Sequence, residues 1–76
     1  MRVKKLTLPT VVEVDDYHYF DWIVELLETF GVSDVKYEEF GVIRGMNYVA
    51  LFYSSKSDPD YVRLRRELRA EQLEAE

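Results

Sequence analysis

The amino-acid sequence predicts a small α+β domain with the element order β-α-β-β-α. Three observations predict it: alternating apolar residues near the N-terminus, two segments with helical apolar periodicity, and the apolar run YVALFY, residues 48–53, between two polar stretches. The length of 76 residues fits one domain, residues 1–76, whose last residues, about 70–76, we expect to be frayed or held by a partner.

The first predicted strand lies between residues 2 and 14. Leu6, Leu8, Val12 and Val14 share one face at period two, which is typical of a strand with one side on a core. Pro9 interrupts the other face, and proline cannot donate to a sheet ladder. We therefore expect this strand to lie at an edge of the sheet, or to break at Pro9 into two short pieces.

The stretch YHYFDWIVELLETF, residues 17–30, predicts a helix with an unusually wide apolar arc. Asp15 or Asp16 can cap its start, and Gly31 is suited to end it. Packing against one sheet needs a stripe of only about 100°, so we expect the outer part of the arc to meet a second neighbour, either the other helix or another molecule. The two adjacent stripes are Phe20, Ile23, Val24 and Leu27, and Tyr19, Trp22, Leu26 and Phe30.

Residues 35–53 predict a β-hairpin, with strands at residues 35–43 and 47–53. We place the turn at Arg44-Gly45 and interpret Gly41 as a bulge. A second helix begins after Asp58, which is a good N-cap followed by Pro59.

The predicted topology is a three-stranded sheet of order 1-3-2 with strands one and three parallel. The apolar third strand belongs in the centre, and a right-handed crossover then places both helices on one face. This arrangement is a ferredoxin-like fold lacking the last strand.

One sheet face would then be open, and its aromatic residues predict a protein interface. The predicted function is a small non-catalytic protein-binding module, most simply a homodimer and otherwise a regulator of a larger protein. Burial of the sheet aromatics within the monomer is the alternative. The predicted interface residues are Tyr19, Trp22, Leu26, Phe30, Tyr37, Tyr48 and Phe52.

Two other binding functions fit parts of the sequence. Tyr37, Tyr48 and Phe52 could stack single-stranded bases, although a net charge of −5 and a missing RNP1 pattern make nucleic acid unfavourable. An acidic face could instead occupy a nucleic-acid groove on an enzyme, as an inhibitor from a phage or mobile element. The predicted phosphate contacts are Arg2, Lys4, Lys5 and Arg44, and the acidic face is Asp15, Asp16, Asp21, Glu25, Glu28, Glu38 and Glu39.

Other functions have little support in the sequence. The chain has no cysteine, and His18 beside acids is better explained as a surface residue than as a general base. We therefore predict no enzyme, metal, cofactor or small-molecule substrate. Without a long apolar run, we expect a cytoplasmic location and no membrane contact. The arginines of the second helix predict a solvated helix face or, alternatively, a site that binds an acidic partner or phosphates. They are Arg63, Arg65, Arg66 and Arg69.

Overall fold

A computed structural model of the protein describes residues 7–75. The predicted contacts Arg2, Lys4 and Lys5 and the strand residue Leu6 lie outside this range. The element order confirms the prediction of three strands and two helices. The elements are β1 (Thr10–Val14), α1 (Tyr19–Thr29), β2 (Lys36–Arg44), β3 (Asn47–Tyr53) and α2 (Pro59–Ala75).

The sheet has the predicted strand order β1-β3-β2, with β3 in the centre. Both pairs are antiparallel, with Val12 opposite Ala50 and Tyr37 opposite Phe52. The prediction that the first and third strands are parallel is therefore wrong. The hairpin turn reverses the chain between β2 and β3, and α1 carries it back between β1 and β2, so β3 runs opposite to both neighbours.

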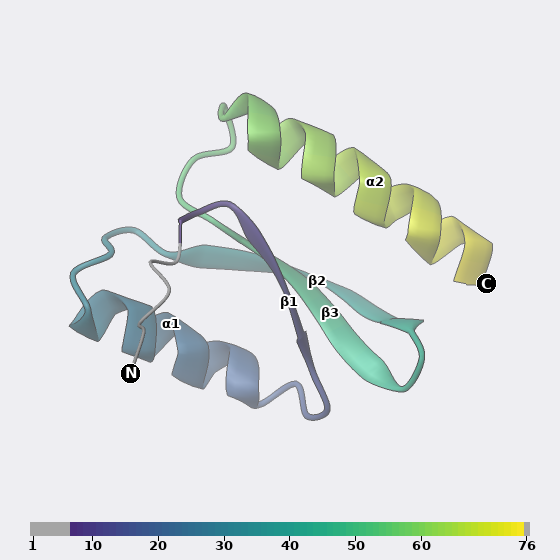
Figure 1. Cartoon of the computed structure of the whole chain (residues 1–76), viewed down its shortest axis with the longest axis horizontal. Helices are drawn as coiled ribbons and strands as arrows, with labels where there is room; N and C mark the ends of the chain where they lie inside the picture. Colours follow the sequence, from purple (N-terminus) through teal and green to yellow (C-terminus); the bar gives the residue numbers. More distant parts are fainter. Residues whose placement is uncertain (1–6, 76) are drawn as a thin grey trace.

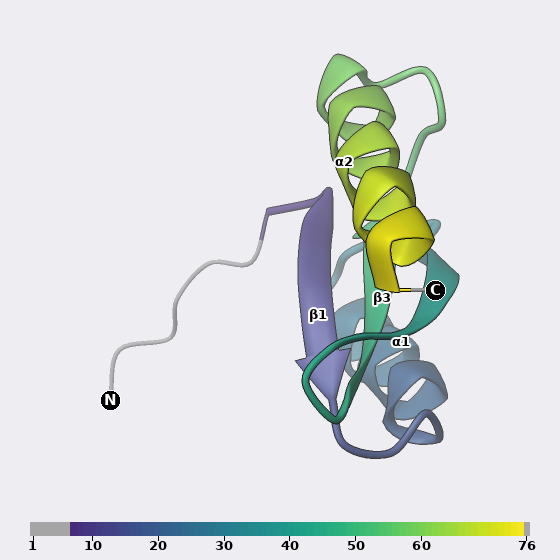
Figure 2. The same ribbon diagram turned by 90° about the vertical axis from the view of Figure 1, so that its right-hand side faces the viewer.

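The two helices cover opposite faces of the sheet, as Figures 1 and 2 show. Alternate residues of β3 enter two separate cores, which corrects the prediction that both helices share one face. The crossover rule applies to a helix between two parallel strands, and no strand follows α2 within residues 7–75. The α2-side core is Phe40, Val49, Leu51, Tyr53, Tyr61 and Leu68, and the α1-side core is Phe20, Leu27, Val35, Ala50 and Phe52.

Glycines end α1 and shape β2 as predicted. Gly31 has φ of 92°, and its N–H donates to Glu28 O at 3.0 Å after the helix ends. Gly41 has φ of 77° at a register shift between Glu39 and Gly41, which confirms the bulge. These positions need the left-handed conformation that glycine adopts without steric cost.

The C-terminal helix stays in contact with the sheet beyond Leu68. The Gln72 side chain donates to Phe40 O at 3.2 Å, and Glu71 pairs with Arg44. Helical structure continues through Ala75. Residues 71 and 72, where the apolar stripe stops, therefore hold α2 to the sheet through polar contacts.

Candidate protein-binding surfaces

An apolar stripe lies exposed along α1. Its four members have exposed fractions of 45%, 61%, 45% and 74%, in chain order. They recur at steps of three and four residues, so they share one side of the helix. We call this surface the α1 stripe; it consists of Tyr19, Trp22, Leu26 and Phe30.

The position of α2 explains why the α1 stripe is uncovered. Phe20 and Leu27 point into the α1-side core, so α1 uses one face against the sheet. The sheet separates α2 from this side of the molecule (Figure 1). No other described helix or strand is therefore in a position to cover the α1 stripe.

The predicted aromatic sheet face is covered rather than open. Phe52 is fully buried beneath α1, and Tyr37 and Tyr48 are half-buried in the same core. The Tyr37 ring stacks on Phe52 with centroids 5.2 Å apart, and its hydroxyl donates to Asp21 Oδ1 at 2.6 Å. The prediction that Tyr37, Tyr48 and Phe52 form an exposed surface is therefore wrong, because α1 and α2 each cover one face.

The predicted acidic residues fall on two sides of the sheet. Asp21, Glu25 and Glu28 follow the side of α1 away from the α1 stripe; we call them the acidic ridge. Glu39 is opposite Ala50, which faces α1. Glu38 faces α2 instead, where its carboxylate accepts from the Tyr61 hydroxyl at 2.9 Å. A single acidic face containing Glu38 is therefore not formed.

Asp15 and Asp16 lie in the loop before α1. Asp16 Oδ1 accepts from the His18 N–H at 2.9 Å and contacts His18 Nδ1 at 2.8 Å. The backbone hydrogen bond, followed by the side-chain one, lowers the pKa of Asp16. Both members of this pair are exposed.

No group of three His, Cys, Asp or Glu side chains within residues 7–75 is arranged to hold a metal ion.

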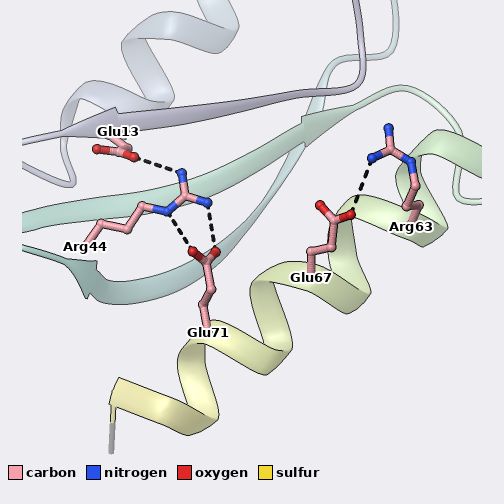
Figure 3. A network of polar contacts seen from close by, with 5 residues as sticks. All are labelled: Glu13, Arg44, Arg63, Glu67 and Glu71. Carbon is pink, nitrogen blue, oxygen red and sulfur yellow. Dashed lines mark hydrogen bonds and ion pairs between the residues drawn. The ribbon is translucent and has the colours of Figure 1, made fainter.

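Arg44 joins β1, β2 and α2 (Figure 3). Its guanidinium donates to Glu13 Oε1 at 2.9 Å and to both carboxylate oxygens of Glu71, at 3.1 and 2.8 Å. The hydrogen bonds to Glu71 and then Glu13 raise the pKa of Arg44. The guanidinium of Arg44, which we predicted to contact phosphates, is thus already bound by two carboxylates. Sequence spacing gave no signal for this cluster, since its three residues come from distant elements.

Hydrogen bonding to Asp21, assisted by burial, raises the pKa of Tyr37 to about 12. The pKa of Tyr61 is also raised, by burial and then by its bond to Glu38. Because the ionised phenol is disfavoured in the folded state, stability from these groups is complete below the ordinary pKa of 10.0. It is lost as the pH rises above that value.

We expect the difference in tyrosinate absorbance between the wild type and Tyr37→Phe to titrate with a midpoint near 12. The Asp21→Asn variant is the matched control, because it keeps the ring and removes the carboxylate. Its Tyr37 should titrate earlier. A wild-type difference curve centred near 10.0 would contradict the assignment.

Comparison of the chain with protein-family models, curated proteins and solved structures gives no match. Within the described residues, neither helix combines the length and apolar character needed to cross a membrane.

Proposed function

We propose that the chain is a small non-catalytic protein-binding module that forms a homodimer through the α1 stripe. The observation that carries this proposal is the exposure of four large apolar side chains on one side of α1. Contiguous exposed apolar patches on soluble proteins mark interaction sites. Tyrosine and tryptophan are also among the residues that contribute most binding energy at interfaces.

The spacing of the α1 stripe supports a second copy as the partner. Steps of three and four residues produce a seam that packs against an identical seam at a shallow crossing angle. A two-fold axis through the centre of the stripe, between Trp22 and Leu26, brings the same patch of each copy together. The acidic ridge lies on the other side of each helix, so the like charges stay apart.

The length of α1 limits the strength of this dimer. Its 11 residues span about 16 Å. A contact between two such helices falls below the roughly 800 Å² per partner of a standard stable interface. We therefore infer a reversible dimer with a dissociation constant in the micromolar range. Because apolar contacts dominate, added salt should leave the dimer unchanged or strengthen it by screening the acidic ridges.

Trp22→Ala should weaken dimerisation by at least about tenfold, because the substitution removes the largest side chain of the seam. Sedimentation equilibrium over a range of protein concentrations measures this change. Leu73→Ala is the control, since Leu73 is 73% exposed on α2, outside the α1 stripe. Thermal unfolding of both variants, measured at low concentration, reports whether the monomer fold is retained.

Two results would reject a homodimer formed through the α1 stripe. One is a wild-type protein that stays monomeric at the highest concentration tested. The other is an equal loss of association in Trp22→Ala and Leu73→Ala, which would place the interface elsewhere.

A larger protein with a basic surface is the second candidate partner. The acidic ridge favours it, because a partner that reached around α1 from the stripe to the ridge would meet apolar and acidic groups on the same helix. This is the regulator function, in which the chain acts as an acidic inhibitor of a larger protein. Association with that partner should weaken in salt and on replacing Glu25 and Glu28 by glutamine, whereas the homodimer should not weaken.

A further inference from the structure

A basic groove lies on the α2 side of the sheet, away from the α1 stripe. It has a volume of about 640 Å³ and is formed by α2 between Tyr61 and Arg69, the loop before α2 and the adjoining strand ends. The buried rings of Tyr53 and Tyr61, with centroids 4.5 Å apart, belong to its lining. Its charged residues are Glu38, Lys56, Arg65, Arg66 and Arg69.

One of the four cations is held by the protein itself. Arg65 Nε donates to Glu38 Oε2 at 3.1 Å, and the Tyr61 hydroxyl donates to Glu38 Oε1 at 2.9 Å. The carboxylate therefore balances Arg65 and fixes its position. A guanidinium held in this way keeps N–H donors for a ligand, because its hydrogen bonds to Glu38 come from Nε and leave the two terminal nitrogens out.

The remaining three cations, Lys56, Arg66 and Arg69, are exposed. Among the ion pairs of residues 7–75, none involves these side chains, although the chain has a net charge of −5. Arg63 on the same helix differs, because Asp60 and Glu67 lie 3.7 and 3.4 Å from its guanidinium (Figure 3 shows Glu67). The unbalanced charge is thus concentrated on the side of α2 that borders the groove.

We infer that this groove binds a ligand with adjacent phosphate groups. Three unbalanced cations around one small volume match the charge density of linked phosphates, which arginine binds through paired N–H donors. The groove volume also lies within the range of roughly 300–1,000 Å³ that is typical of small-ligand sites.

An acidic peptide matches the groove less well. An extended peptide carries at most one carboxylate per residue and alternates its side chains between two sides. The adjoining edge strand β2 is also interrupted by two register shifts, at Glu39/Gly41 and Val42/Arg44, which disfavour addition of a further strand. The ligand is therefore held by side chains of α2 and the preceding loop.

Inorganic tripolyphosphate is the first probe, added to the full chain in low salt without divalent cations. Calorimetry should show saturable binding of one molecule per chain. Replacing both Arg66 and Arg69 by glutamine should weaken it by at least about tenfold, because two charge-assisted contacts are lost. Arg63→Gln is the matched control and should change the affinity by less than about twofold, since its charge is already balanced.

A second titration with ATP tests whether the groove binds a phosphate chain alone or a whole nucleotide. Equal affinities for ATP and tripolyphosphate mean that the groove binds the phosphate chain alone, and tighter ATP binding means that it also contacts the nucleoside. Three results would overturn the inference: no saturable binding of either probe, equal losses in the double variant and Arg63→Gln, or tighter binding of a glutamate oligomer than of tripolyphosphate. Circular dichroism of each variant verifies that these exposed substitutions leave the fold intact.

Discussion

Phe52→Ala is expected to remove most of the protein's free energy of unfolding. Phe52 is fully buried, and its ring lies 5.9 Å from that of Phe20 and 5.2 Å from that of Tyr37. Truncating a buried phenylalanine costs about 3–5 kcal/mol through lost apolar burial and the cavity left behind. A domain of 76 residues has a free energy of unfolding at the low end of the usual 5–15 kcal/mol. One substitution therefore removes most of the stability.

Trp22→Ala is the control for this prediction, because it removes a larger aromatic side chain from a position that is 61% exposed. Urea unfolding of both variants, followed by circular dichroism at low protein concentration, measures the difference in free energy of unfolding. We expect the Trp22 variant to lose less than about 1 kcal/mol. A Phe52 variant that unfolds at nearly the wild-type urea concentration would show that the α1-side core does not form as described.

Leu68→Ala is expected to have the second largest effect, with a loss of about 2–5 kcal/mol in the free energy of unfolding. Leu68 is 1% exposed and packs with Val49, Leu51 and Tyr61 between α2 and the sheet. The Ala side chain would leave a cavity in this second core. Urea unfolding again provides the measurement.

Leu73→Ala makes the same substitution on the same helix at a site that is 73% exposed. Helix propensity changes equally in both variants, so the difference between them isolates burial against the sheet. We expect the Leu73 variant to stay within about 0.5 kcal/mol of the wild type. Equal effects at the two sites would contradict the position of α2 over the second sheet face.

Local sequence signals predicted the elements well. The alternation through Val12 and Val14, the helical stripes of α1 and the glycines at positions 31 and 41 each act within a few residues of the structure that they produce. The apolar run in β3 also indicated that both sheet faces need cover. The structure supplies that cover with α2 on one face and α1 on the other.

Long-range choices were less predictable. Periodicity does not encode contacts between distant segments. These contacts determine whether β1 and β3 pair parallel or antiparallel, and which face of the sheet α2 covers. The wide apolar arc of α1 predicted that its outer part needs a second neighbour, either the other helix or another molecule, and the structure leaves this part exposed. Tyr37, Tyr48 and Phe52 were assigned to the surface because the predicted topology left their face open.

The basic groove was only partly visible in the sequence. The arginines of α2 indicated a charged helix face, and their spacing identified neighbours on that face. The partner of Arg65 was not predictable, because Glu38 reaches it from another element, whereas Glu67 lies one turn from Arg63 on the same helix. This difference determines which arginines are free to meet a ligand.

The central position of β3 has a consequence for the order in which the chain folds. The β2–β3 hairpin forms from neighbouring residues, whereas β1 must wait for β3, with Val14 pairing to Tyr48 and Thr10 to Phe52. During synthesis, β1 and α1 leave the ribosome before the strand against which both pack. The α1-side core consequently lacks Ala50 and Phe52 until β3 has emerged, and it closes only after most of the chain has been made.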